Sequence, residues 1–299
     1  MSVGEALLKL CDAQETCSIA VVGTAKNVGK TVITGVLCSA LYARGVRFGI
    51  ASVGRDGEAL DVVDTMPKPR LRLHPDTIAA TARELLRPSP ACEILEVSDM
   101  PTALGPVVFV RTRAPAVVEL AGPPSASAVR AMKRRLSEFG AQRVILDGAI
   151  DRLAALAGEP DAVIVATGAS ASTTIEAAAE DVGALVRRLQ TPAFDPAQQY
   201  VRISHALDAR AVSELIRATE TRQVVVTDPT RIAVHGHALI RAHEKLRIRC
   251  ERPLRVVAVT VASIGRDRYF EPRAFARAVA AQTRLPTFDA YSDRLEQVA

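Results

Sequence analysis

The sequence predicts an α/β fold with a doubly wound, mostly parallel sheet. Short apolar runs alternate with longer stretches whose apolar residues recur at helical spacing, which is typical of parallel strands joined by crossover helices. A hydrophobic content of 48% is ample for a large core. A chain of 299 residues could form one large domain or two smaller ones. We expect a single domain over residues 1–299, with a small inserted subdomain at 66–113.

The N-terminal part predicts a helix, a strand and a second helix, in that order. Residues 1–15 form a short amphipathic pattern that includes acidic side chains. Residues 19–22 are wholly apolar and predict a buried strand. After an intervening loop, apolar residues recur at helical spacing from Val32 to Leu41, and Gly45 marks the expected end of this helix.

The loop at residues 23–31 matches the pattern G-x-x-x-x-G-K-[ST], between the strand and the helix that this pattern requires. Glycines let the backbone curl around an anion, so that its N–H groups and the N-terminus of the following helix point at phosphate. The lysine can reach the terminal phosphates, and the threonine hydroxyl can bind Mg²⁺. We therefore predict a phosphate-binding loop with nucleotide contacts from Gly23, Thr24, Asn27, Val28, Gly29, Lys30 and Thr31.

The middle of the chain predicts a strand at 46–53 and then an irregular insertion. Several prolines interrupt the alternation between residues 66 and 113, where the pattern predicts one helix at 77–86 and apolar runs at 93–97 and 107–110. We interpret this segment as a lid or a substrate-facing subdomain.

Regular alternation resumes after residue 115. Strands are expected at 116–120, 144–148, 162–168, 223–227 and 255–261, with a short last piece at 285–289 that closes the sheet. Helices are expected at 127–139, 172–189, 206–219 and 271–283.

Acidic residues follow three of the predicted strands, and the ligand of an open α/β sheet lies outside the carboxyl ends of its strands. Glu119 and Asp147 end apolar runs, and Asp56 follows the strand at 46–53. A phosphate-binding enzyme needs an acid there to hold Mg²⁺. The alternative for Glu119 and Asp147 is an ordinary polar strand end. For Asp56 it is a solvated turn, because Gly-Arg-Asp-Gly also has good turn chemistry.

From these positions we assign roles to the candidate residues. Thr31, Glu119 and Asp147 are the candidate metal ligands. Lys30, Asp56 and Glu119 are the candidate catalytic residues, with Asp56 orienting the nucleophile or a metal-bound water. ATP and Mg²⁺ are the expected cofactors.

Composition and charge argue against several other classes. The five cysteines are odd in number and scattered, which argues against a disulfide framework and a zinc site. Aromatic residues make up 4% of the chain, too few for the stacking platforms of a single-strand nucleic-acid binder. No apolar run approaches the length of a membrane span, and no secretory signal is visible, so we expect a cytoplasmic protein. His235, His237 and His243 lack accompanying ligands of matching spacing and are interpreted as a solvated basic face.

The loop at 23–31 and the sequence Val-Val-Glu-Leu-Ala-Gly at 117–122 resemble the dethiobiotin synthetase branch of P-loop proteins, which carries G-T-x-x-x-V-G-K-T and V-E-G-A-G-G. The wider group includes cobyrinic acid synthases and the MinD-like ATPases. The resemblance implies a P-loop NTPase fold, with ATP at the loop and Mg²⁺ near Thr31 and an acid such as Glu119.

The sequence departs from this branch at several positions. Pro123 replaces the second glycine of the closing Gly-Gly pair of this motif, and residues 52–56 replace the lysine and proline that help to hold a diaminopelargonic substrate. The signature lysine of the MinD-like ATPases would fall on Ala25, and Lys26 is one place away. These departures argue against biotin synthesis.

A longer series of landmarks resembles the P-loop subunit family of the lysine 5,6-aminomutase reactivase. This resemblance covers most of the chain and implies an ATP-dependent partner that helps to exchange damaged adenosylcobalamin on the mutase. The landmarks are the segments at 52–58, 68–70, 79–82, 118–123, 147–152 and 228–230.

Three hypotheses remain open. In the first, the chain is an ATPase that acts on a protein partner, either the aminomutase or a second reactivase subunit. In the second, it is a metabolic ligase of the dethiobiotin synthetase type that activates a small carboxylate or carbamate. In the third, it is a non-catalytic nucleotide-binding scaffold. The expected partners do not include nucleic acid or a membrane, and a homodimer stays open.

Overall fold

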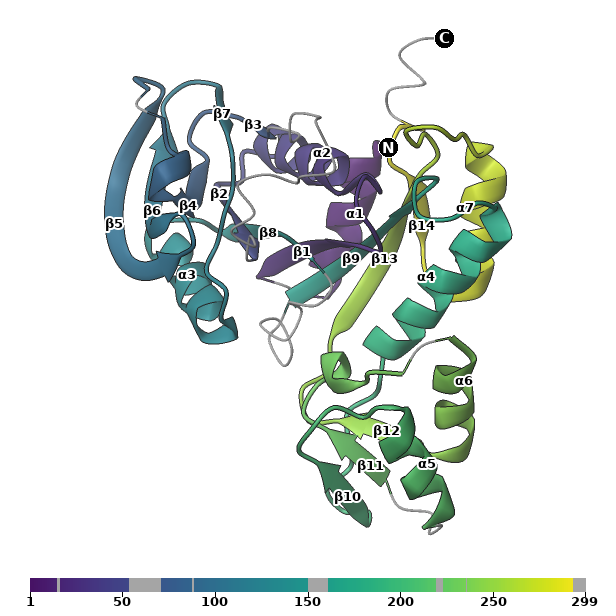
Figure 1. The fold of residues 1–299 in the computed structure, drawn as a ribbon. Helices are drawn as coiled ribbons and strands as arrows, with labels where there is room; N and C mark the ends of the chain where they lie inside the picture. Colours follow the sequence, from purple (N-terminus) through teal and green to yellow (C-terminus); the bar gives the residue numbers. More distant parts are fainter. Residues whose placement is uncertain are drawn as a thin grey trace. The chain divides into compact units, whose positions relative to one another are not determined.

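The computed structural model describes residues 1–14, 17–53, 71–87, 89–149, 161–218, 223–234 and 236–292 of the chain (Figure 1). Contacts within the chain divide it into two compact units. The first comprises Met1–Gly23, Gly29–Ala155 and Ala290–Ala299, and the second comprises Thr24–Val28 and Leu156–Asp289. The single domain over residues 1–299 and the inserted subdomain at 66–113 stay predictions.

A mostly parallel sheet lies at the centre of the first unit. Strands β1, β8, β2 and β4 are parallel neighbours in that order, and β6 runs antiparallel to both β4 and β5. Every residue of β1 is buried, as expected for a parallel strand that is covered on both faces. The bounds are β1 (Ser18–Gly23), β8 (Arg143–Ala149), β2 (Phe48–Val53), β4 (Ile78–Ala82), β6 (Gly105–Thr112) and β5 (Cys92–Thr102).

Helices cover both faces of this sheet (Figure 1). A Cβ on Gly49 of β2 would lie 3.1 Å from the Cβ of Leu136, so this residue faces α3. The preceding Phe48 pairs with Arg143 of β8, whose guanidinium donates to Asp12 of α1. Successive strand residues point to opposite faces, so α1 and α3 lie on opposite faces, which is compatible with a doubly wound fold. The helices are α1 (Val3–Asp12), α2 (Lys30–Ala43) and α3 (Ala126–Glu138).

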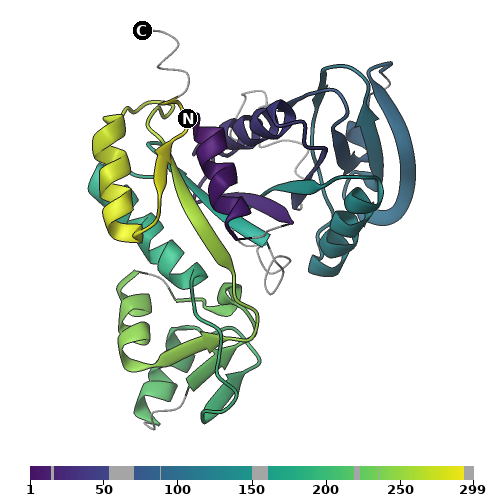
Figure 2. The same cartoon turned by 180° about the vertical axis from the view of Figure 1, so that it is seen from behind.

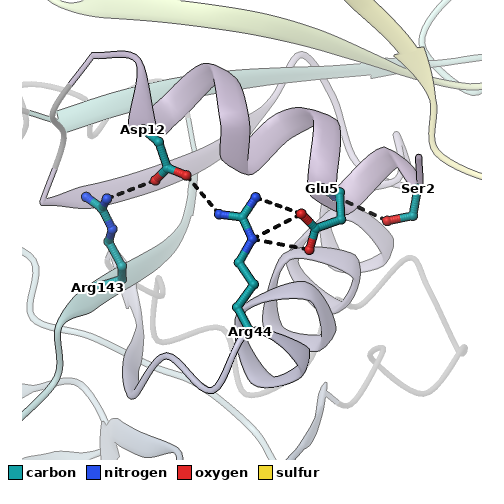
Figure 3. Close-up of polar contacts among 5 residues, drawn as sticks. All are labelled: Ser2, Glu5, Asp12, Arg44 and Arg143. Carbon is teal, nitrogen blue, oxygen red and sulfur yellow. Dashed lines mark hydrogen bonds and ion pairs between the residues drawn. The ribbon is translucent and has the colours of Figure 1, made fainter.

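Ion pairs attach α1 to its neighbours (Figure 3). Arg44 follows α2 and donates to Oε2 of Glu5 at 2.7 Å and to Oδ2 of Asp12 at 2.8 Å. Arg143 donates to Oδ1 of the same aspartate at 2.9 Å. The Ser2 hydroxyl caps the helix by accepting from the N–H of Glu5 at 3.2 Å. The predicted N-terminal amphipathic helix is thereby confirmed.

The second unit has two sets of parallel strands, each with its own helices. Strand β13 pairs in parallel with β9 on one side and with β14 on the other, and α4 and α7 pack together beside these strands. Gly183 permits this close packing, since a Cβ there would lie 3.0 Å from the Cβ of Gln282. The bounds are β9 (Asp161–Gly168), β13 (Arg255–Ala262), β14 (Thr287–Asp289), α4 (Ile175–Leu189) and α7 (Pro272–Thr283).

The smaller sheet of this unit consists of β10, β11 and β12 in parallel order. It shares an apolar core with α5 and α6 that includes Leu207, Val226, Leu239 and Ile248. The bounds are β10 (Tyr200–Ile203), β11 (Gln223–Val226), β12 (Arg247–Cys250), α5 (Ala209–Arg217) and α6 (Gly236–Lys245). The strand expected at 223–227 is present, but it belongs to this separate sheet and does not pair with β13.

Two sequence-based expectations are wrong. The helix predicted at 77–86 is instead β4 followed by the 3-10 turn η1 (Arg83–Leu85). The apolar, threonine-containing run from Ile78 to Ala82 is wholly buried between β2 and β6, and such pairing overrides helical spacing. The expected buried strand at 116–120 is the short β7 (Ala116–Val118), which pairs antiparallel with β3 (Leu71–Leu73) and leaves Val117 59% exposed.

The remaining expected elements are present with small shifts of their ends, and the α/β class is confirmed. The described part of the 66–113 segment supplies β4, β6 and β5 to the sheet of the first unit. Among the helices of the described residues, none is long and apolar enough to cross a membrane.

Candidate functional site

The loop that follows β1 contains two residues with a left-handed backbone conformation. Asn27 and Gly29 have positive φ angles of 58° and 86°, in the left-handed region where glycine is favoured. Gly29 precedes the first turn of α2, where no side chain caps the helix and no acidic residue is present. The first N–H groups of a helix have no intrahelical partner, so this N-terminus can receive an anion.

The body of the loop, residues 24–28, rests on the end of β9 within the second unit. The Thr24 N–H donates to the carbonyl of Ala166 at 2.9 Å, and its hydroxyl donates to that of Thr167 at 3.2 Å. Val28 is buried, and its Cα would lie 3.0 Å from a Cβ on Gly168. The close approach of these two backbones therefore requires glycine at position 168.

Asp147 lies near the carboxyl end of β8, in the strand next to β1. Its Oδ1 is shielded from solvent and has no hydrogen-bond partner among the described residues. Burial raises the pKa of this carboxyl, while the positive charge of Lys30 and a hydrogen bond from the Gly148 backbone act in the opposite direction. A buried, unpartnered carboxylate oxygen near a lysine of the loop has the chemistry of a cation ligand.

Glu119 lies at the same edge of the sheet, beyond the end of β7. Its carbonyl accepts from the Thr81 hydroxyl at 2.6 Å, and the same hydroxyl accepts from the N–H of Ala121 at 3.3 Å. These bonds attach the segment to β4. The sequence drew attention to the acid but missed this anchor, because the region of Thr81 was expected to be helical.

The sheet register sets the distance between Asp147 on β8 and Thr81 on β4, the residue that anchors Glu119. Asp147 pairs with Ser52 of β2, while Ala51 pairs with Ala80 of β4, so Thr81 lies in line with Ser52. Neighbouring strands are about 4.8 Å apart, which puts the Cα of Thr81 about 10 Å from that of Asp147. Asp147 is in the strand beside β1, whereas the anchor of Glu119 is two strands further along.

Several candidate residues cannot be placed. Asp56 and the neighbouring Arg55 lie outside the described residues, as does His235, and the side chain of His237 is likewise not described.

His243 lies on α6, where burial and then the charges of Arg187 and Arg249 lower its pKa. Within the described part of the chain, no group of three His, Cys, Asp or Glu side chains could hold a metal ion.

Three of the five cysteines are buried. Cys11, Cys38 and Cys250 are buried free thiols, and burial raises the pKa of each to about 12. Buried thiols of this kind are inert.

Comparison with known proteins finds no matching family model, curated protein or solved structure. The functional argument therefore rests on the residues of the chain and their geometry.

Proposed function

We propose that residues 23–31 bind the phosphates of Mg²⁺–ATP and that the protein is a P-loop ATPase acting on a protein partner. The observation that carries this proposal is the unpartnered Oδ1 of Asp147, in the strand next to β1 and under the influence of the Lys30 charge. A structural acid would be expected to have its buried oxygens satisfied. A bound cation would be the missing partner of the Asp147 Oδ1.

The chain supplies a separate group for each part of the ligand. The backbone N–H groups of the loop and of the first turn of α2 would bind phosphate oxygens, and Lys30 would neutralise the terminal phosphates. Thr31 and Asp147 would hold Mg²⁺, which offsets the phosphate charge when bound. We assign the metal to Asp147 before Glu119, because Asp147 lies in the strand beside β1.

The absence of a three-residue metal cluster among the described residues is compatible with this site. Mg²⁺ is usually held by one or two carboxylates together with substrate phosphates and water, and does not need a dedicated protein cage. Asp56, outside the described residues, stays our candidate for orienting the attacking group, and Glu119 is the alternative.

The proposed partner is a cobalamin-dependent aminomutase or a second reactivase subunit. This part of the proposal rests on the landmark segments described above, from residues 52–58 to 228–230. A partner-acting ATPase should hydrolyse ATP slowly alone and faster when the mutase is added. Release of ADP that depends on a small carboxylate, and not on a protein, would contradict this assignment and favour a ligase.

Calorimetry of Lys30→Ala with Mg²⁺–ATP tests the binding proposal, with Lys26→Ala as the matched control. Loss of the loop lysine should abolish measurable ATP binding while the apo protein melts nearly as before, because Lys30 is partly exposed. Lys26→Ala should retain binding, since this exposed residue lies outside the motif position. Undiminished affinity in Lys30→Ala would overturn the proposal.

A further inference from the structure

A cavity of about 580 Å³ lies among α4, α6 and the C-terminal end of α7, all within the second unit. Both ribbon views show α6 and α7 beside α4 (Figures 1 and 2). The volume of the cavity is in the usual range for small-molecule sites. None of its lining residues belongs to the phosphate loop or to the candidate acids.

The charges that line the cavity are separated by sign along α4. Glu180 and Asp181 lie toward one end, and Arg187 and Arg188 lie toward the other. Seven residues of helix separate the first acid from the first arginine, which corresponds to about 10 Å at 1.5 Å per residue. The wall between the two ends includes Ala184 and Leu185 of α4, together with Leu239 and Ile240 of α6.

Some of the charged side chains that line the cavity have no ion-pair or hydrogen-bond partner among the described residues. Glu180 and Arg187 make no ion pair or hydrogen bond with any other residue of the described ranges. Arg188 donates through Nη1 to the carbonyl of Ile232 at 3.4 Å, but its shielded Nε has no partner among the described residues. Asp181 is only weakly engaged, accepting from the Ser172 hydroxyl at 3.2 Å.

We propose that this cavity binds a small zwitterion whose cationic and anionic ends are joined by a short apolar chain. Glu180, with Asp181, would bind the cationic end, and Arg187 with Arg188 would bind the anionic end through guanidinium N–H groups. The intervening apolar side chains would contact the methylene groups. A simple anion would leave the two acids unpaired, and a simple cation would leave the two arginines unpaired.

Calorimetry on the full chain can test this with three probes of similar length: ε-aminocaproate, hexanoate and hexylamine. The zwitterion should bind about fivefold more tightly than either singly charged probe, since one extra charge pair at a partly exposed site contributes up to about 1 kcal/mol. Glu180→Gln should weaken zwitterion binding about fivefold and leave hexanoate unchanged. Arg187→Gln should weaken the binding of both ε-aminocaproate and hexanoate.

Both substituted side chains are exposed, so the variants should fold as the parent does. The matched controls are Glu176→Gln on α4 and Arg273→Gln on α7, exposed charges outside the cavity lining that should leave affinity unchanged. The proposal is overturned if ε-aminocaproate binds no more tightly than hexanoate or hexylamine. It is equally overturned if Glu180→Gln and Arg187→Gln bind the zwitterion as the parent does.

Discussion

Burial raises the pKa of the Asp147 carboxyl, and the positive charge of Lys30 opposes this shift without cancelling it. The lysine begins α2, which follows β1, and the acid is near the end of β8, which pairs with β1, so this strand pairing brings the two groups to the same part of the first unit. In the absence of a ligand, this carboxylate is an energetic cost to the fold. A cation at the loop would remove that cost.

Asp147→Asn should therefore affect ligand binding and stability in opposite directions. The variant should lose about 10- to 100-fold in its affinity for Mg²⁺–ATP, an effect typical of losing a metal-supporting side chain. Its affinity for ATP in EDTA should change much less. Without nucleotide the variant should melt above the wild type at neutral pH, because a buried charge is replaced by a neutral amide. Asp161→Asn, at the start of β9, is the control for ligand affinity.

The stability difference between Asp147→Asn and the wild type should depend on pH. An acid whose pKa is raised in the folded protein is destabilising when ionised, and this penalty is present above the folded-state pKa. As pH falls through the folded pKa toward 3.8, the usual value, the carboxyl becomes protonated and the penalty disappears. The melting temperatures of the two proteins should thus converge in acid. A difference that grows in acid would contradict the prediction.

Much of the fold could be predicted because its parallel strands are buried on both faces. β1 and β9 appear as unbroken apolar runs, and every residue in them is buried. Ser125 and Thr174 cap the N-termini of α3 and α4, and their hydroxyls accept from the backbone N–H three residues later. Local signals of these kinds do not depend on distant contacts.

The errors lie where distant pairing decides the outcome. β4 is flanked by β2 and β6, strands that come from before and after it in the chain, and no local pattern reports that arrangement. The hydroxyl contact between Thr24 and Thr167 spans 143 positions and likewise has no sequence signal. The loop and Asp147 could be proposed as site candidates because motif spacing and strand ends are local, whereas the anchoring of Glu119 by Thr81 has no local signal.

The ion pairs of Arg44 should contribute modestly to stability through α1. Arg44→Ala removes the link to both Glu5 and Asp12, and we expect the melting temperature to fall by about 2 °C at low salt. The side chains are partly exposed, so the loss should shrink at high salt, where exposed charges are screened. Arg210→Ala, which removes a more exposed pair with Glu214 on α5, should shift melting less.

Gly168→Ala should lower both the stability of the second unit and the affinity for ATP. The added Cβ would lie 3.0 Å from the Cα of Val28 and 3.1 Å from the Cβ of Ala262, and backbone cannot yield as the tip of a flexible side chain can. Overpacking of this kind costs about 1–3 kcal/mol. Because Val28 is part of the loop that we propose binds phosphate, its displacement should also lower ATP affinity.

A glycine with open surroundings provides the control for this substitution. Gly35 lies within α2, where the contact of a new Cβ among the described residues would be the Cδ1 of Leu71 at 3.9 Å. Gly35→Ala should stabilise the protein by up to about 1 kcal/mol, since alanine favours a helix interior, and should leave ATP affinity unchanged. Chemical denaturation and calorimetry on the two variants measure both effects. If Gly168→Ala binds ATP as tightly as Gly35→Ala does, the contact between Val28 and Gly168 does not shape the loop.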